Sequence, residues 1–493
     1  MKILFIMPPF ERLIGTRLAY FPIGLGYLAA CLDKVGFPVA IYNAETPSEN
    51  ERLSKNTNIA SLSGYDNYER SLKDDNHMVW QELKGVLRDF HPDVIGISVT
   101  SAKVASAQKI TSICKDYNPQ CLVAWGGPHP TIQPEEVLQY DEVDLVIKGE
   151  GETTFLEVIK NLNSGTLDFE QIKGISFKKK GKIFHNECRP LIENLDDLPF
   201  PLRSCLVHPE RYLSWDMGVI ITSRGCPFNC AFCAAQNIWG RKTRYRSIKS
   251  VIDEIRKVAL DFGTRQVFFW DDTFNLDRKR LTELCEGLLA CRLGISWRCT
   301  ARVDLLDDQM LRLMRRAGCN SIDIGIESGS DRILGIINKG LNREKVLRGI
   351  SMIRKNGINF NAFFMIGFPD ETEEDILETL ALMQNKAMGT IILSIFTPYP
   401  GTELYQRATD LGLVNRDLDW GLFSHHSPHN HFVKNITPER FLQIVRETSL
   451  FVDKHNNSLR VFLRTHRNEV GFYLRNPRIF YNKARQKLKF GLS

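Results

Sequence analysis

Apolar runs alternate with amphipathic stretches over the first 160 residues of the chain. The run KILFIM at residues 2–7 is continuously apolar, as expected of a strand that is buried on both faces of a sheet. Strands are predicted at 2–7, 37–42, 93–99, 121–127 and 144–152, with helices near 21–32, 80–90, 103–117 and 153–162. This alternation is typical of an α/β fold with a doubly wound, Rossmann-like or flavodoxin-like parallel sheet, which binds ligands at the carboxyl ends of its strands. The polar stretch 45–77 is predicted to be a long loop or insertion.

The alternation starts again at residue 216. Strands are predicted at 218–223, 266–272, 295–302, 321–328, 359–367 and 390–398, with helices near 248–262, 278–291, 307–317, 342–356 and 371–387. Six strands are too few for a closed eight-stranded barrel, so the pattern predicts an open (β/α)6 partial TIM barrel, with its chemistry at the carboxyl ends of the strands. The predicted division is a doubly wound domain at 1–164, a connector at 165–215 with a possible hairpin at 174–185, the partial barrel at 216–405, and a mostly helical, basic C-terminal region at 406–493.

Composition and charge narrow the class of protein. Of the 493 residues, 43% are hydrophobic and 25% are charged, which are ordinary values for a folded protein. The sequence has no apolar run long enough to span a bilayer, and its first residues lack the features of a secretory signal. We therefore expect a cytoplasmic protein with reduced thiols, in which twelve cysteines pose the question of metal binding. The net charge is +6, and residues 451–493 alone carry +8, so the basic excess belongs to the tail.

Three cysteines follow the first barrel strand on one short loop. The sequence SRGCPFNCAFC places Cys226, Cys230 and Cys233 at the spacing C-x₃-C-x₂-C. Three thiolates on such a loop can bind three irons of a cubane cluster and leave the fourth iron open for a small molecule. A zinc site or free thiols are the alternatives, although zinc loops usually contain two separated pairs of ligands. The other nine cysteines are scattered, as is typical of small core residues.

This loop and its place after the first of six barrel strands resemble the radical S-adenosylmethionine (radical SAM) superfamily. The resemblance implies that Cys226, Cys230 and Cys233 bind a 4Fe–4S cluster. The open iron would chelate the amino and carboxylate groups of S-adenosylmethionine, which one electron then cleaves to a 5′-deoxyadenosyl radical. It also suggests contacts to this co-substrate from residues that end the second, third and fourth strands, namely Asp272, Arg302 and Glu327. Salt bridges and helix caps are the alternative roles for these charges.

The first domain resembles the cobalamin-binding subclass of the same superfamily. The matching segments are MPPF (7–10), FPIGLGYLAA (21–30), SVTSA (98–102) and WGGPHPT (125–131). The resemblance implies cobalamin contacts from strand ends and the loops after them, namely Pro9, Ser98, Thr100, Gly126, Gly127, His129, Gly149 and Glu150. No Asp-x-His-x-x-Gly pattern follows the first strand, so we expect no protein histidine on the lower face of cobalt. The alternatives are an unliganded scaffold or another nucleotide site, although no G-x-G-x-x-G follows the first strand.

Two C-terminal features have no clear function from sequence. The segment HHSPHNH at 425–431 holds four histidines, but their spacing and the proline favour a surface or substrate-facing loop over a metal site. The tail interleaves aromatic and basic residues, including Phe462, Arg464 and Tyr481. A helix packed on the barrel, contact with an anionic membrane surface and, less favoured, nucleic-acid binding are the alternatives for the tail.

Together the resemblances imply a cobalamin-dependent radical SAM enzyme that functionalises an unactivated C–H bond of a small-molecule or lipid-like metabolite. In the commonest outcome, methylcobalamin gives its methyl group to the substrate, a second S-adenosylmethionine regenerates it, and a flavodoxin or ferredoxin supplies electrons. A cyclase or other ring-forming, ring-contracting or oxidising enzyme is one alternative, and a non-catalytic cobalamin-sensing protein is another. Methyl transfer requires both domains to present the carboxyl ends of their strands to one cavity.

Overall fold

A seven-stranded sheet forms the core of the N-terminal part of the computed structural model, which describes residues 1–17, 19–48, 51, 58–165, 168–414, 419–465, 477 and 481. The strand order is β2-β1-β3-β4-β5-β6-β7, and β1 to β5 are parallel. The strands are β1 (Ile3–Met7), β2 (Val39–Asn43), β3 (Val94–Ser98), β4 (Leu122–Gly126), β5 (Leu145–Ile147), β6 (Ile175–Lys179) and β7 (Lys182–His185). The order 2-1-3-4-5 is that of flavodoxin-like sheets, which confirms the predicted fold.

Helices cover both faces of this sheet. On one face, α2 and α9 pack against Ile3 and Phe5, and on the other α5 and α6 pack against Leu4 and Ile6. Alternate residues of β1 thus face opposite layers, which explains why the strand is apolar throughout. The helices of this part are α1 (Glu11–Ile14), α2 (Ile23–Asp33), α3 (Asn58–Ser63), α4 (Tyr65–Lys73), α5 (Met78–Phe90), α6 (Val104–Tyr117), α7 (Pro128–Ile132), α8 (Pro134–Val137) and α9 (Gly151–Asn163).

The hairpin predicted at 174–185 is confirmed as β6 and β7. It pairs antiparallel to β5 and therefore extends the first sheet beyond residue 164. Between this hairpin and the barrel, the chain contains three short 3₁₀ helices, η2 (Leu195–Asp197), η3 (Pro209–Arg211) and η4 (Ser214–Met217).

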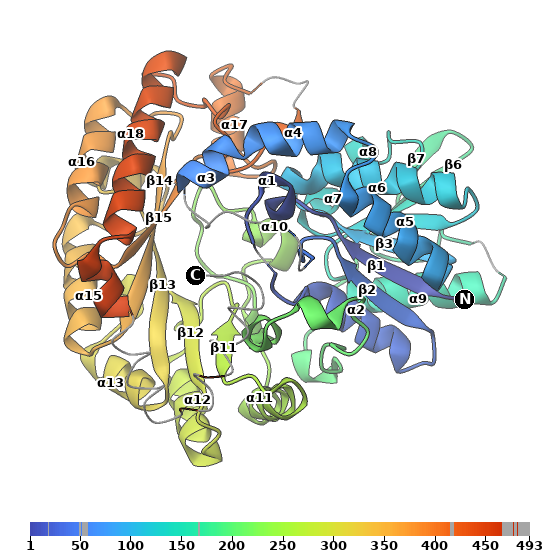
Figure 1. Cartoon of the computed structure of the whole chain (residues 1–493), viewed down its shortest axis with the longest axis horizontal. Coiled ribbons are helices and arrows are strands. Elements are labelled where there is room, and N and C mark those ends of the chain that lie inside the picture. Colours follow the sequence, from blue (N-terminus) through green and yellow to red (C-terminus); the bar gives the residue numbers. More distant parts are fainter. Residues whose placement is uncertain are drawn as a thin grey trace.

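The prediction of a long loop at 45–77 is wrong for its second half, which forms α3 and α4. Tyr65 and Tyr68 of α4 are fully buried and pack edge-on against Phe10, so two aromatic side chains anchor a helix whose other residues are mostly polar. The start of α3 is held from the far end of the chain, because Asp453 accepts hydrogen bonds from the backbone of Asn58 and Ile59. Figure 1 shows α3 and α4 reaching from the N-terminal domain toward the barrel.

The second sheet is an open barrel of six parallel strands, in the order β15-β14-β13-β12-β11-β8. This confirms the predicted partial barrel (Figure 1). The strands are β8 (Val219–Ile220), β11 (Gln266–Phe269), β12 (Ser296–Ala301), β13 (Cys319–Glu327), β14 (Asn359–Ile366) and β15 (Thr390–Ile395). The helices are α10 (Ala235–Trp239), α11 (Ile248–Phe262), α12 (Arg278–Cys291), α13 (Asp308–Arg316), α14 (Asp331–Ile336), α15 (Arg343–Lys355), α16 (Glu373–Met383), α17 (Glu403–Asp410) and α18 (Pro438–Asn456). The remaining short elements are η1 (Ser101–Lys103), β9 (Ser223–Arg224), β10 (Arg244–Tyr245), η5 (Val303–Leu305) and η6 (Trp420–Leu422).

Polar side chains start the barrel helices. The N-cap side chains accept hydrogen bonds from backbone N–H groups of the first turn, at Ser247, Asp277, Asp307, Asn342 and Thr372. Such caps stabilise a helix by about 1 kcal/mol each and fix where each strand-to-helix loop ends. In the GFPDET segment at 367–372, Thr372 caps α16, whereas Asp370 pairs with Arg407.

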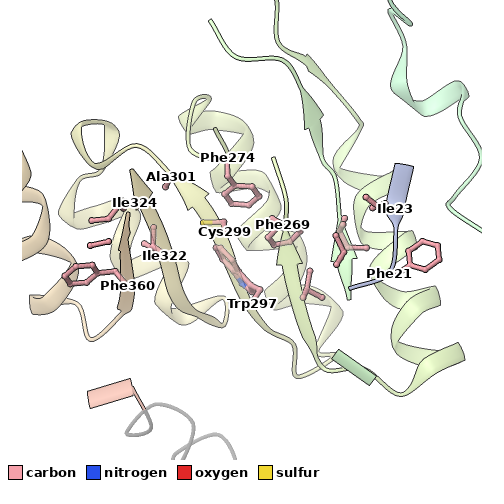
Figure 2. Close-up of a cluster of buried hydrophobic side chains, with 14 of the residues drawn as sticks. Phe21, Ile23, Phe269, Phe274, Trp297, Cys299, Ala301, Ile322, Ile324 and Phe360 are labelled. Carbon is pink, nitrogen blue, oxygen red and sulfur yellow. The ribbon is translucent and has the colours of Figure 1, made fainter. Parts of the chain in front are cut away.

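One continuous hydrophobic core joins the two domains. It contains Phe5 and Phe155 of the first sheet and its helix layer together with Phe269 and Trp297 of the barrel. Figure 2 shows Phe21 and Ile23, from the segment where α2 begins, at the edge of this cluster, with Phe269 of β11 between them and Trp297 of β12. The shared core fixes the orientation of the two sheets, and therefore of their carboxyl ends.

The C-terminal region contains the helices α17 and α18, with the short η6 and a mostly irregular stretch between them. The long helix α18 packs on β15 and α3, and Phe462 and Arg464 follow it. Most of the basic tail, at 466–476, 478–480 and 482–493, lies outside the described residues. None of the described helices is long and apolar enough to cross a membrane.

Candidate functional site

The carboxyl ends of both sheets open into one cavity of about 760 Å³. Met7, Ser98 and Gly126 line it from the first sheet, and Ile221, Asp272 and Thr300 line it from the barrel. The geometric prediction, that both domains present strand ends to a single cavity, is therefore confirmed. Parallel α/β sheets place their ligands at this edge, so the cavity is the candidate site.

The cavity continues as a slot between the first sheet and the helices α2 and α9. Gly96 and Ala124 line the sheet side of the slot, and Leu25, Leu28 and Phe155 line the helix side. Small side chains on the central strands leave this space open. A slot of this kind, between a sheet and its helices, has room for an extended group such as the nucleotide tail of cobalamin. No histidine lines the cavity among the described residues.

Five of the residues expected to contact cobalamin line this cavity, namely Ser98, Gly126, Gly127, Gly149 and Glu150. Gly127 has a φ of 101°, and a Cβ there would lie 3.0 Å from the carbonyl oxygen of Val99, so the tight turn requires glycine. Pro9 and Thr100 do not line the cavity. His129 is buried away from the cavity, where its Nδ1 lies 3.1 Å from the Ser101 hydroxyl and its ring packs edge-on against Trp420. Burial lowers the pKa of His129 to about 4.

The cysteine loop begins and ends at a two-strand ladder, β9 with β10, at the rim of the cavity. Asp271 and Asp272 from the turn after β11 hold its start. The buried Asp271 carboxylate accepts hydrogen bonds from the backbone and hydroxyl of Thr222 at 2.7 and 2.5 Å, and Asp272 accepts one from the Gly225 backbone at 3.2 Å. The Thr273 hydroxyl lies 3.4 Å from the Cys226 sulfur. Asp272 therefore holds the cysteine loop through its hydrogen bond from Gly225, and its side chain also lines the cavity.

The three thiols of the loop are half-buried and form no disulfide. Burial raises the pKa of Cys230, and it raises the pKa of Cys233 to about 11, so a bound metal must displace their protons. No cluster of three or more His, Cys, Asp or Glu side chains in the described part of the chain suits a single metal ion. A cubane cluster does not require three side chains to meet at a single metal ion, because each thiolate binds a different iron. The donor set and the short loop therefore fit an iron–sulfur cluster better than mononuclear zinc.

A buried ion pair lies beside Cys230. The Lys339 ammonium donates to Glu327 Oε1 at 2.7 Å, and both side chains are about 10% exposed. Glu327 has a φ of 69°, at an irregularity in the pairing of β13 with β14, so its backbone is held in an unusual conformation. The positive charges of Lys339 and Arg302 oppose the effect of burial on the pKa of Cys230. Sequence reasoning found Glu327 and missed Lys339, which no motif distinguishes.

Arg302 is already engaged within the chain. Its Nε and Nη2 donate to the Asp304 carboxylate at 3.1 and 3.0 Å, and Nη2 also donates to the Lys339 carbonyl oxygen. Its guanidinium carbon lies 3.8 Å from the ring centroid of Phe228, a residue of the cysteine loop. In this arrangement Arg302 supports the cysteine loop and the Lys339 backbone, as the salt-bridge alternative anticipated.

A buried ion-pair network ties the cysteine loop to the first domain. Arg224, in β9, donates to Glu150 and Glu152 at 2.6 and 2.5 Å, and Arg244, in β10, donates to Glu150 at 2.8 Å. These side chains are at most 7% exposed. Glu150 was expected to contact cobalamin. It lines the cavity, but its carboxylate forms ion pairs with Arg224 and Arg244. The network fixes both ends of the cysteine loop relative to the slot.

The histidine-rich segment follows the last barrel strand. The His425 carbonyl accepts a hydrogen bond from the backbone of Ile395, and its Nδ1 lies 3.2 Å from the Tyr399 hydroxyl. His431 contacts the carbonyl oxygen of Ile436 through Nε2. The His425 and His426 rings pack edge-on with centroids 4.9 Å apart, whereas His429 packs on Tyr65 and His431 on the Ile436 carbonyl, so the four rings do not share one centre.

Models of two known families match the chain. The radical SAM superfamily model matches residues 220–383, and the B12 binding domain model matches residues 70–159. The two matches cover the cysteine loop with its barrel and most of the sheet that lines the slot.

Relatives of known sequence cover nearly the whole chain. An uncharacterized methyltransferase of Pyrococcus horikoshii is 31% identical over 454 residues, which is 91% of each chain. Cytidylyl-2-hydroxyethylphosphonate methyltransferase of Streptomyces wedmorensis is 27% identical over 80% of this chain and 79% of its own. An anaerobic magnesium-protoporphyrin IX monomethyl ester cyclase of Rubrivivax gelatinosus is 28% identical over 68% of this chain and 62% of its own.

The fold is also similar to solved structures. The radical S-adenosylmethionine methyltransferase TsrM of Kitasatospora setae, bound to tryptophan and an S-adenosylmethionine analogue, superposes with a TM-score of 0.69 over 99% of this chain and all of its own, at 16% identity. Both family models, a relative of matching length and the common fold agree. The chain belongs to the cobalamin-binding radical SAM enzymes, whose cofactors are a 4Fe–4S cluster, S-adenosylmethionine and cobalamin.

Proposed function

We propose that this enzyme transfers a methyl group to an unactivated carbon of a small-molecule substrate. The observation that carries the proposal is the single cavity. It is lined both by the strand ends of the first sheet and by residues next to the cysteine loop. A cofactor that delivers a methyl group and one that removes a hydrogen atom must reach the same carbon, and a shared cavity allows this. The two named relatives that cover the largest share of this chain, 91% and 80%, are both methyltransferases.

When bound, the cofactors convert a substrate C–H bond, two S-adenosylmethionine molecules and two electrons into C–CH₃, 5′-deoxyadenosine, methionine and S-adenosylhomocysteine. The chain's own residues position these groups. Cys226, Cys230 and Cys233 would hold the cluster. The carboxylates of Asp272 and Glu327 face the region beside it, where they would accept hydrogen bonds from the amino group and ribose hydroxyls of S-adenosylmethionine. A flavodoxin or ferredoxin would supply the electrons.

The walls of the cavity serve the same reaction by limiting water. Its lining is dominated by apolar side chains such as Phe21, Leu25 and Trp239. Exclusion of water protects a reactive carbon centre from side reactions. Gly126 and Gly127 would let the planar face of cobalamin approach the backbone, since they carry no Cβ.

Labelled methyl groups test the proposal. The enzyme is reconstituted anaerobically with iron, sulfide and cobalamin, and is given S-adenosylmethionine with a deuterated methyl group, a reductant and a small-molecule extract. Methyl transfer predicts a product heavier by a CD₃ group in place of hydrogen. The similarity to the cyclase of Rubrivivax gelatinosus favours ring formation as the second candidate. Consumption of a metabolite with 5′-deoxyadenosine release and no label in any product would support ring formation and contradict methyl transfer.

A further inference from the structure

A cation and three aromatic rings line the barrel beside the cavity and belong to none of the cofactor contacts described above. Arg298 lies on β12 two residues before Thr300, so both side chains point to the same face of the strand, and Thr300 lines the cavity. The intervening Cys299 and the preceding Trp297 point to the opposite, buried face, as Figure 2 shows. Arg298 therefore points into the barrel, where it contacts the cavity-lining Tyr20 and lies next to the residues that line the cavity.

The guanidinium of Arg298 is held by two contacts, and some of its N–H donors have no partner within the part of the chain that the structure describes. It stacks on Phe268 with its central carbon 3.9 Å from the ring centroid, and Nη2 donates to the Tyr20 hydroxyl at 2.7 Å. Among the described residues no carboxylate lies within salt-bridge distance of it, although its charge acts on the buried Asp323, where it opposes the effect of burial on the pKa of that carboxyl. The nearby Asp323 instead accepts a hydrogen bond from Asn361 at 2.7 Å. A half-buried guanidinium with a fixed orientation and unused N–H donors is suited to bind an acidic group.

The rings beside this cation form a platform. Trp270 lines the cavity and is 45% exposed. Its ring stacks with Phe268 at 5.8 Å and 18°, and Tyr20 meets it edge-on at 5.8 Å. An exposed tryptophan face inside a cavity is a stacking surface for a planar ligand. The platform and the cation are adjacent, since Phe268 contacts both.

We propose that Arg298 and Trp270 form the substrate subsite, and that the substrate is an aromatic or otherwise planar molecule with one carboxylate. The ring would stack on Trp270 while the carboxylate pairs with Arg298. A single negative charge is favoured over a phosphate dianion, because one guanidinium is available and Asp323 places a competing carboxylate nearby. This substrate class rests on the proposed function, which the experiment below tests separately.

Matched probes test the subsite without turnover. Binding of 2-naphthoate and of its uncharged analogue 2-naphthamide is measured by anaerobic equilibrium dialysis against the reconstituted holoenzyme with S-adenosylmethionine. We expect naphthoate to bind about tenfold more tightly than naphthamide, the effect of a charge-assisted hydrogen bond. Arg298→Gln abolishes this preference, Arg298→Lys keeps part of it, and the surface control Arg256→Gln leaves it unchanged. No preference in the wild type, or the same preference in Arg298→Gln, overturns the proposal.

The number of charges is tested with a third probe, 2-naphthyl phosphate. Tighter binding of this dianion than of naphthoate would overturn the choice of a carboxylate. Cofactor spectra of the Arg298 variants that match the wild type show that the fold and the metal centres are intact.

Turnover identifies the real substrate class. A small-molecule extract of the source organism is separated on a strong anion exchanger at pH 10, and each pool is incubated with the holoenzyme and CD₃-labelled S-adenosylmethionine. The label is expected in an aromatic compound of the retained pool. A labelled product only in the flow-through overturns the subsite. No label in either pool contradicts methyl transfer, while the naphthoate measurements still decide whether Arg298 binds acids.

Discussion

Glu150 sits where the two domains and the cysteine loop meet, and its charge is the most sensitive point of that junction. Its carboxylate accepts hydrogen bonds from Arg224, from Arg244 and from the Ile192 backbone, at 2.6, 2.8 and 2.7 Å. The side chain is only 3% exposed. The substitution Glu150→Gln keeps its shape and removes its charge.

The cost of this substitution follows from burial. Glu150→Gln leaves two buried guanidinium groups with only Glu152 as a carboxylate partner, and loss of one partner of a buried ion pair costs about 3–5 kcal/mol. The pair of Lys242 with Glu193 lies in the same region, at the end of the cysteine loop, but both side chains are 72% exposed. The control Glu193→Gln should therefore change the free energy of unfolding little, because water screens an exposed ion pair.

The effect depends on pH with a defined sign. Burial raises the pKa of Glu150, but the hydrogen bonds and charges of Arg244 and Arg224 outweigh burial, so its pKa lies below the ordinary value. A carboxylate with a lowered pKa stabilises the fold above the ordinary pKa, near 4.3, and loses this stabilisation as the pH falls through the lowered value. The difference between wild type and Glu150→Gln should therefore be full at neutral pH and shrink in acid.

Anaerobic urea unfolding, followed by tryptophan fluorescence on the cofactor-free chain, measures these differences. We expect Glu150→Gln to lower the unfolding midpoint strongly and Glu193→Gln to change it little. Equal midpoints for the two variants at neutral pH would refute the reasoning that the buried network holds the junction together.

Three further predictions follow from the site. Cys226→Ala should abolish cluster assembly and reduce S-adenosylmethionine cleavage to background, whereas Cys188→Ala, at an exposed cysteine, should leave both unchanged; iron analysis and 5′-deoxyadenosine assays check this. Burial raises the pKa of Glu371 to about 8, so stability should fall as the pH rises from 4.5 to 8, and Glu371→Gln should flatten this slope in pH-dependent unfolding. Since no histidine lines the cavity among the described residues, the paramagnetic resonance spectrum of bound cob(II)inamide, which has no benzimidazole of its own, should lack coupling to a nitrogen ligand, and clear nitrogen coupling would contradict the expected absence of a histidine ligand.

The sequence predicted the layers of the fold well, because buried parallel strands are continuous apolar runs. KILFIM at 2–7 became β1, at Ile3–Met7. The first barrel strand was predicted at 218–223 and is only Val219–Ile220. Thr222 leaves the sheet to bond Asp271, and β9 pairs with β10 instead of continuing the strand. Competing tertiary contacts of this kind leave no signal in hydrophobicity.

The candidate site was predictable where local spacing carries the chemistry. The cysteine loop could be found because its three thiols lie within eight residues. The bonds from Arg224 to Glu150 and from Lys339 to Glu327 could not, since they join residues that are brought together only by packing. The helix α4 was missed because its buried stripe, at the helical spacing of Tyr65, Tyr68 and Ser71, contains only two apolar rings within an otherwise polar segment.

The central claim is that the cysteine loop leaves one iron of its cluster open to S-adenosylmethionine. Paramagnetic resonance of the reduced, reconstituted enzyme tests this claim most directly. Addition of S-adenosylmethionine should shift the spectrum of the cluster, because the co-substrate binds the open iron. A spectrum that does not change on addition, or the absence of any cluster signal, would contradict the account.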